Sequence, residues 1–215
     1  MALVHSPKIV TDNLVLCLDA GNTKSYPGTG TAWNDLSGNG NNGTLTNGPT
    51  FNSDKGGCFI FDGSNDHVSF SSYSQPAYSS SSSFTWSIWL YPLDTSDDVI
   101  MGSRGSDLDF TKLTTNNFEY YSANFGGAMT LNEWQNICIT KNGTSFTYYK
   151  NGSSIATQTS NITKPSKPFF IAGDTTSVGA EYSNSRISVV AVYNTALTAS
   201  EVEQNYNAHK GRFGL

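Results

Sequence analysis

The chain has 215 residues, a length that suits one domain with a sizeable core. Only 13% of the residues are charged and the formal net charge is −5, so the clustered Lys and Arg that nucleic acid or an anionic membrane surface requires are missing. Aromatic residues make up another 13%, too many for a disordered polar chain. The abundance of Ser, Thr, Asn and Gly instead indicates an all-β protein with neutral polar turns.

The chain begins with a predicted N-terminal arm, residues 1–12, followed by a single domain over residues 13–215. The arm lacks the basic start and long apolar core of a signal peptide, and no apolar run in the chain approaches the length of a membrane span. Four aliphatic side chains of the arm need cover from water. They belong to Leu3, Val4, Ile9 and Val10. The arm either folds back as an edge strand of its own domain or pairs with a neighbouring chain, and we favour the neighbouring chain as the partner.

The stretch Ser37–Gly43 reads SGNGNNG and contains a formal G-x-G-x-x-G pattern. A phosphate-binding loop of this kind must follow a buried strand and open a helix. Here a short polar segment precedes the glycines and β-forming residues follow them, so the context of a phosphate site is absent.

Short β-patterned runs recur between Gly and Asn turn signals. In Phe84–Tyr91 apolar residues alternate, which places Trp86 and Trp89 on opposite faces of one strand. Asn142-Gly143 is a strong hairpin signal. Such runs, without alternating helices, predict an antiparallel sandwich of two sheets. The runs are 14–18, 58–61, 67–70, 84–91, 134–141, 145–150, 169–172 and 186–193.

One short C-terminal helix is predicted after Leu197. Thr198 and Glu201 have the spacing of a capping box, and Leu197 and Val202 have that of the accompanying hydrophobic staple. Gly211 is expected to end a helix of about ten residues.

The three cysteines, Cys17, Cys58 and Cys138, lie in apolar or β-like segments without metal-ligand spacing. We interpret them as buried free thiols, which is typical of a chain folded in a reducing cytoplasm.

Catalytic patterns are weak. Glycoside hydrolysis needs two carboxylates across the scissile bond, yet only Glu201 and Glu203 are close in sequence and both belong to the helix. Asp107 and Asp109 have strand spacing but no partner glutamate, and we interpret them as a solvated pair. The histidines, His5, His67 and His209, are isolated. We therefore expect no enzymatic activity.

Oxygen-rich turns are candidates for a calcium site, the only cofactor we consider. Their side chains supply the hard oxygen ligands that Ca²⁺ prefers. The alternative, which we favour, is that Asp and Asn occur there because they stabilise turns. The candidate ligands are Asp35, Asn39, Asp62, Asn65 and Asp66.

Trp89 and Tyr91 lie on the strand face opposite to Trp86 and are candidates for contact with a partner or a glycan. Exposed aromatic rings offer apolar faces to pyranose rings. The alternative, which we favour, is that they are core residues or cover another surface of the protein.

Several blocks together resemble the concanavalin A-like lectin/glucanase superfamily in its laminin G-like branch. They are FIFDGSNDHVSF, FTWSIWLYP, NEWQNICITKNGTSFTYYKNGS and RISVVAVYNTALTASEVEQNYNAHKGRFGL. The resemblance runs from about Leu14 to Leu215 and implies a two-sheet antiparallel jelly-roll sandwich with one short C-terminal helix. It also implies that SGNGNNG is a rim loop leading into an early strand. The Glu-x-Asp-x-x-Glu strand of the superfamily's glucanases does not occur in this chain.

The opening MALVHSPKIVTDNLVLCLDAGN resembles virion proteins of tailed bacteriophages, particularly those of marine cyanobacteria. This resemblance implies a non-enzymatic structural protein, a head decoration or appendage component made in the bacterial host cytoplasm. Its expected partners are other virion proteins and further copies of itself. The alternative function is that of a lectin-like module that binds host-surface glycans.

Overall fold

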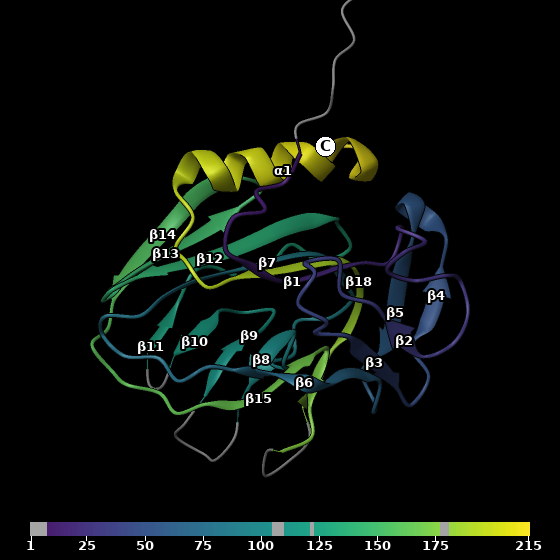
Figure 1. The fold of residues 1–215 in the computed structure, drawn as a ribbon, viewed down its shortest axis with the longest axis horizontal. Coiled ribbons are helices and arrows are strands. Elements are labelled where there is room, and N and C mark those ends of the chain that lie inside the picture. The colour runs from purple at the N-terminus through teal and green to yellow at the C-terminus, as the bar shows by residue number, and fades with distance from the viewer. Residues whose placement is uncertain (1–7, 105–109, 121–122, 177–180) are drawn as a thin grey trace, which may run out of the picture.

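The computed structural model describes residues 8–104, 110–120, 123–176 and 181–215. Figure 1 shows two β-sheets packed face to face, with helix α1 (Ala199–Phe213) lying across the outer face of one of them. The expected jelly-roll sandwich with a C-terminal helix is confirmed.

The first sheet, called sheet A, contains eight strands in the order β14-β13-β12-β7-β18-β5-β4, with β1 pairing with β18 off this path. All its pairings are antiparallel. Its strands are β1 Leu14–Asp19, β4 Thr50–Asn52, β5 Cys58–Asp62, β7 Ser83–Pro92, β12 Gln135–Asn142, β13 Ser145–Lys150, β14 Ser153–Thr159 and β18 Asn184–Tyr193.

The second sheet, called sheet B, also has eight antiparallel strands, in the order β11-β10-β9-β8-β15-β6-β3-β2. A separate two-stranded ribbon pairs β16 with β17, and a 3-10 turn, η1, spans Asp54–Gly56. The strands of sheet B are β2 Ala32–Trp33, β3 Gly43–Thr46, β6 His67–Gln75, β8 Met101–Ser103, β9 Thr111–Leu113, β10 Phe118–Tyr120, β11 Ala123–Phe125 and β15 Lys167–Ile171. The ribbon consists of β16 Gly173–Asp174 and β17 Glu181–Tyr182.

The main core fills the space between the two sheets, and Trp86 lies near its centre. The Trp86 ring centroid is 5.7 Å from that of Phe118 and 5.4 Å from that of Phe169, both on strands of sheet B. Trp86 belongs to sheet A, and its alternation with Trp89 follows the predicted pattern. Aromatic contacts across the sandwich therefore join the two sheets.

The loop that contains SGNGNNG closes the open edge of β1. The amide of Leu36 donates to the carbonyl of Cys17 over 2.8 Å, and the Asn41 side-chain amide donates to the carbonyl of Val15 over 2.7 Å. Gly38 and Gly40 have φ values of 90° and 74°, which only glycine adopts readily and which let the loop fold back on the strand. The loop thus takes the place of a neighbouring strand and satisfies backbone groups that would otherwise be unpaired.

Two hairpins join β12, β13 and β14. In the first, Asn142 pairs with Ser145, so the loop is Gly143-Thr144, one residue later than predicted, with positive φ at Gly143. In the second, Asn151 and Gly152 both have positive φ, the signature of a type I′ turn. Sequence analysis did not identify this second hairpin or the strand that follows it.

Helix α1 begins at the predicted cap and ends later than predicted. The Thr198 hydroxyl accepts from the Glu201 amide over 3.3 Å, and the Glu201 carboxylate accepts from the Thr198 amide over 2.8 Å. The helix has fifteen residues, more than the expected length of about ten. It continues through Gly211 to Phe213 and is capped by Gly214, which has a φ of 81°. The prediction of Gly211 as the stop was wrong, because packing of the last turn on sheet A outweighs the weak helix preference of glycine.

Replacing Thr198 by Ala removes the capping hydroxyl, and we expect the free energy of unfolding to fall by about 1 kcal/mol. Chemical denaturation of the wild type and of Thr198→Ala measures the change. Ser200→Ala, in the same exposed turn, is the matched control and should stay within about 0.5 kcal/mol of the wild type. An unchanged midpoint in Thr198→Ala would contradict the role of the cap.

Replacing Asp35 by Ala removes the acceptor for three backbone amides, those of Cys17, Ser37 and Asn41. Because these donors then lose their partner, we expect the free energy of unfolding to fall by about 1–3 kcal/mol. Asp12→Ala, an exposed site in the turn before β1, is the control. Equal stability of the two variants would show that the loop does not need this carboxylate.

Candidate functional site

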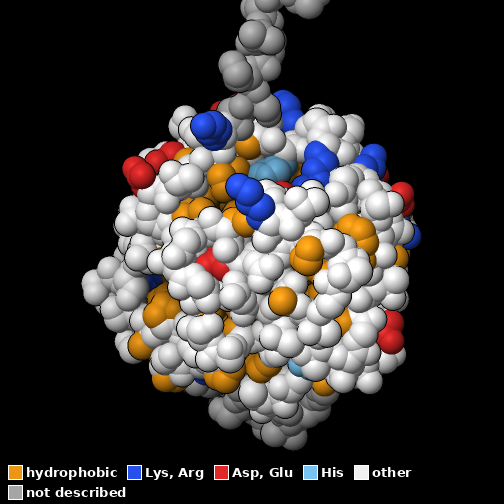
Figure 2. Space-filling model, turned by 45° about the vertical axis from the view of Figure 1, so that its right-hand side comes forward, with side chains coloured by type: hydrophobic (Ala, Val, Ile, Leu, Met, Phe, Trp, Pro, Cys, Tyr) orange, Lys and Arg blue, Asp and Glu red, His pale blue; other side chains and the backbone are white. Residues whose placement is uncertain are grey.

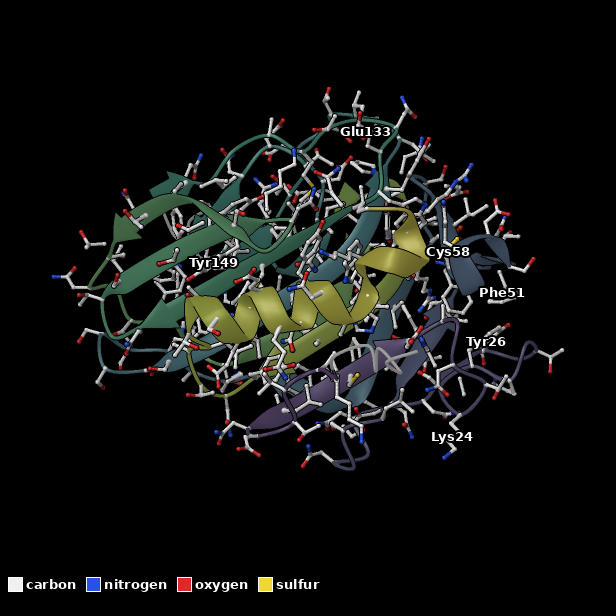
Figure 3. The ribbon with its side chains drawn as sticks, turned by 90° about the horizontal axis from the view of Figure 1, so that it is seen from above. Lys24, Tyr26, Phe51, Cys58, Glu133 and Tyr149 are labelled. Atoms are coloured by element: carbon white, nitrogen blue, oxygen red, sulfur yellow. The ribbon has the colours of Figure 1, made fainter. Side chains whose placement is uncertain are left out.

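The outer face of sheet A is covered by α1, which hides the predicted aromatic platform. Trp89 is only 2% exposed, and its ring stacks on those of Phe213 and Tyr206 at centroid distances of 4.2 and 5.6 Å. Figure 3, seen from above, shows α1 lying across the sheet with Tyr149 beside it. The glycan or partner contact considered for Trp89 is therefore wrong and the favoured alternative holds, because this ring packs against the chain's own helix and offers no face to a glycan.

The described part of the N-terminal arm also packs on the chain's own domain. The amide of Val10 donates to Asn205 over 2.8 Å, and the Tyr193 hydroxyl donates to the Val10 carbonyl over 3.0 Å. Ile9 lines a groove with Cys17 and the helix. Ile9 and Val10 thus pack on the chain's own domain and do not need the neighbouring chain that we favoured as their partner. The predicted alternative, an edge strand, is not observed either, because residues 8–12 do not form a strand. Leu3 and Val4 lie outside the described residues.

Tyr91 and Trp134 form a half-exposed aromatic pair near the C-terminal end of α1. Their ring centroids are 5.8 Å apart, and Trp134 also contacts Phe213 at 4.8 Å. The guanidinium of Arg186 lies over Tyr91 at 5.2 Å from the ring centroid. Figure 3 places Glu133, the neighbour of Trp134, at the edge of the sheet beside this end of the helix. We call Tyr91, Trp134 and Arg186 the aromatic rim site.

Sequence analysis placed Tyr91 in this role but assigned none to Trp134 or Arg186. The three residues come from β7, the residue before β12, and β18, which are neighbours only in the folded sheet. A signal was present, since Trp134 stands next to Glu133 in a polar stretch just before an apolar strand. The site combines partly exposed rings with a cation, a combination suited to a polar ligand with an apolar face.

A groove of about 360 Å³ lies between the N-terminal arm, β1 and α1. His209 lines it, and its ring centroid is 6.4 Å from that of Trp89. Burial lowers the pKa of His209 below its ordinary value, an effect that the Asn205 carbonyl and Asp19 oppose and Arg212 reinforces. The imidazole is therefore disfavoured in its charged form while α1 is docked.

An ionic cluster lies on sheet B and the adjoining β17. The ammonium of Lys112 is 2.9 Å from the Glu181 carboxylate and 3.4 Å from that of Glu119, and Arg104 pairs with Glu181. Lys112 is 2% exposed and Glu119 is 6% exposed. Burial raises the pKa of the Glu119 carboxyl, and the nearby ammonium of Lys112 opposes that shift. The topology thus brings together two of the five glutamates, with a lysine between them.

The other candidate acids do not join this pair. Glu201 caps α1, Glu203 is exposed on the same helix, and Glu133 is exposed before β12. Asp107 and Asp109 lie outside the described residues.

The five candidate calcium ligands fall into two separate turns, at opposite ends of β3. Asp35 accepts four hydrogen bonds, two at each carboxylate oxygen, which fills its acceptor capacity. Asn39 donates its side-chain amide to the Leu14 carbonyl over 3.0 Å. Both residues therefore serve the edge of β1 in this structure.

The second turn contains Asp62, Asn65 and Asp66. Asp62 accepts the amide of Ser64 over 2.8 Å, and this hydrogen bond lowers the pKa of Asp62. Burial raises the pKa of Asp66. Among the described residues no group of three His, Cys, Asp or Glu side chains is placed to hold a metal ion. Calcium at this turn stays a prediction, one that needs backbone and Asn oxygens as well.

The prediction of buried free thiols is confirmed for Cys17, Cys58 and Cys138. Burial raises the pKa of Cys17 to about 12 and that of Cys58 to about 11, and it also raises the pKa of Cys138. These thiols are therefore protonated near neutral pH and are poor nucleophiles.

The remaining surface is mostly polar. On the face that Figure 2 views, hydrophobic side chains occur in small separate groups, and Lys and Arg side chains gather in the upper part, where α1 lies in Figure 1. In the part of the chain that the structure describes, no helix has the length and apolarity to cross a membrane.

A family model described as the concanavalin A-like lectin/glucanases superfamily matches residues 62–203. A search of curated protein sequences finds no match. The fold is similar to the binding domain of Paraclostridial Mosquitocidal Protein 1, with a TM-score of 0.63 and 20% identity over 92% of this chain and 52% of that one.

Two further solved structures share the fold at low identity. The botulinum neurotoxin serotype G binding domain has a TM-score of 0.62 and 17% identity over 90% of this chain and 50% of that one. Trypanosoma rangeli sialidase has a TM-score of 0.69 and 14% identity over 98% of this chain and 36% of that one. The chain thus spans about half of each of the two binding domains and about a third of the sialidase.

Replacing Lys112 by Met leaves the buried Glu119 without its cation, whereas Glu181 keeps its ion pair with Arg104. We expect the free energy of unfolding to fall by about 3–5 kcal/mol, the usual cost of breaking a buried ion pair from one side. Thermal and chemical denaturation measure it. Lys24→Met, at an exposed lysine, is the matched control, and similar stability of the two variants would show that the cluster is not strongly coupled.

The pKa of His209 is lower in the folded state than in the unfolded state. The stability that the neutral His209 side chain contributes is therefore fully present above the unfolded pKa of about 6.5. That contribution is lost as the pH falls through the lowered folded pKa. Replacing His209 by Gln should therefore flatten the decline in unfolding free energy between about pH 7 and pH 5. Denaturant titrations across that range provide the test, and parallel profiles for the wild type and the variant would contradict it.

Proposed function

The chain belongs to the concanavalin A-like lectin/glucanases superfamily, and from this premise we propose that it is a non-enzymatic binding module. We propose further that it is a structural component of a phage particle, a head decoration or appendage protein that attaches to other virion subunits. It would be made in the cytoplasm of the bacterial host.

The non-enzymatic proposal rests on one observation, the ion pairing of Glu119 and Glu181 with Lys112. Sugar hydrolysis requires one carboxyl group that donates a proton and another that attacks or activates water, on either side of an accessible bond. Glu119 and Glu181 instead share the buried ammonium of Lys112. An ion-paired and largely buried pair leaves no room for a sugar ring between the two groups.

The particle proposal is supported by the opening residues of the chain, which resemble phage virion proteins. The surface is consistent with it, since neutral polar side chains dominate and the net charge is only −5. The three free thiols fit folding in a reducing cytoplasm before assembly.

Glycan binding is the alternative, and the aromatic rim site favours it. Trp134 and Tyr91 expose parts of two rings next to a guanidinium. Two of the similar structures are described as binding domains, one of a mosquitocidal protein and one of a neurotoxin. A glycan would stack on these rings and hydrogen-bond to Arg186.

Quantitative mass spectrometry of purified particles tests the particle proposal. We expect the chain at a fixed ratio to a head or tail protein, and its absence from particles would refute the proposal.

A glycan array with the wild type, Trp134→Ala and Tyr182→Ala tests the alternative. Glycan binding that is lost in Trp134→Ala and kept in Tyr182→Ala would establish the aromatic rim site as a glycan-binding site. Release of reducing sugar from any arrayed glycan would overturn the non-enzymatic assignment.

A further inference from the structure

The two sheets leave a pocket between them at the end of the sandwich where β6 ends and β7 begins. Its volume is about 170 Å³. Sheet A contributes the start of β1, the start of β7 and the end of β18, and sheet B contributes the end of β6. The segment between β6 and β7 completes the wall. The pocket therefore joins the main core to the surface.

The inner wall of this pocket is apolar and buried, whereas its mouth is polar and exposed. Tyr78, Phe84 and Val192 line the inner wall, and each is at most 3% exposed. Ser74 and Asn194 line the pocket and are exposed to solvent. The described residues around the pocket carry no charge, so an ionic ligand would lose its hydration without gaining a partner. The walls thus favour an uncharged, largely apolar ligand.

Hydrogen bonds hold the wall between β6 and β7 in place. The amide of Tyr78 donates to the Lys164 carbonyl over 2.8 Å, and the Lys164 amide donates back to the Tyr78 carbonyl over 2.7 Å. The buried ammonium of Lys141 donates to the carbonyls of Ser79 and Ser82 over 2.7 and 3.0 Å. A wall fixed in this way need not be ordered when a ligand enters, which lowers the entropic cost of binding.

Tyr73 provides a polar group within this largely apolar surface. Its ring centroid is 6.0 Å from that of Phe70 and 5.2 Å from that of Phe169, so the ring is fixed against the core. Burial raises the pKa of Tyr73, and the phenol is therefore neutral near neutral pH. Among the described residues, no hydrogen bond reaches its hydroxyl. The hydroxyl can thus donate to a ligand or accept from one.

An apolar space of this size forfeits packing contacts when it is empty, and protein interiors contain few such spaces. Water fits it poorly, because a buried water molecule needs two to four polar partners. An apolar cavity of about 150 Å³ accommodates one benzene molecule, so the volume of this pocket corresponds to a single aromatic ring.

We propose that this pocket binds a small uncharged aromatic molecule with one ring and one hydroxyl, that is, a free phenol. The ring would pack against Tyr78 and Phe84, whose own rings are 4.4 Å apart between centroids. The ligand hydroxyl would form a hydrogen bond with the hydroxyl of Tyr73. The inference concerns the space between the sheets and does not depend on the proposed function.

NMR of methyl groups, in a titration of the full chain with phenol, tests the proposal. The methyl signals of Val15 and Val192, which line the pocket, should shift and saturate. We expect a dissociation constant of about 1 mM, ordinary for a ligand of so few atoms. Val189 packs with Trp89 and Phe213 under α1 and is the internal reference. Unmoved signals of Val15 and Val192, or shifts at Val189 alone, would overturn the proposal.

Tyr73→Phe removes the hydroxyl and keeps the ring. We expect its dissociation constant for phenol to rise about threefold or more, whereas that for toluene should stay the same. Tyr182→Phe is the matched control, since Tyr182 lies beside His67 at the other end of β6, and it should change neither constant. Equal affinity of the wild type and Tyr73→Phe for phenol would contradict the predicted hydrogen bond.

Val15→Phe places a ring in the pocket, and we expect binding of both phenol and toluene to be lost. Circular dichroism and melting temperature verify that the variant folds, and Tyr73→Phe tests the site independently of it. Methyl glucoside, an uncharged sugar, should leave the signals of Val15 and Val192 in place. Phenol binding that persists in a folded Val15→Phe, or shifts of these signals by the sugar, would contradict the proposal.

Discussion

The architecture depends on one central strand, β18, whose backbone must be paired on both sides. Along one side β18 pairs with β7 from Ser185 to Tyr193. Its other side is divided, with β5 pairing up to Ile187 and β1 pairing from Val189. At the division, Ser188 donates its hydroxyl to the carbonyl of Gly57 over 2.6 Å. A buried strand with unmatched amides would cost several kcal/mol, so sheet A holds together only when all three neighbours are in place.

The polar, glycine-rich composition has a specific role in this arrangement. Asn39, Asn41 and Asp35 use short side chains to bond backbone groups of β1 that a ninth strand would otherwise pair. Such residues also tolerate the tight backbone of the loop. The outer face of the same sheet is closed differently, by the aromatic stack of Trp89 with Phe213. Edge and face are thus protected by separate means.

Local features could be predicted from the sequence, and features that depend on distant partners could not. The Thr198 cap was predictable because all its groups lie within four residues. The alternation of Trp86 and Trp89 predicted their faces, but periodicity says nothing about a helix arriving from the other end of the chain. Lys112 and its two glutamates come from different strands, so only the topology brings them together. In sheet B, the strands of two to four residues, β2, β3 and β8 to β11, lack long apolar runs and gave no signal above that of loops.

The position of β18 as the last strand of the described sheets has a consequence for biosynthesis. A ribosome makes β1, β5 and β7 long before the strand that pairs with all three, and α1 comes after that strand. Until residues 184–213 have left the exit tunnel, the nascent chain carries three strands with open sides and an uncovered Trp89. Folding of sheet A therefore waits for the last strand and depends on many non-local contacts, a topology that folds slowly. Premature termination anywhere before Asn184 would remove the centre of the sheet, and such fragments would be substrates for chaperones and proteases.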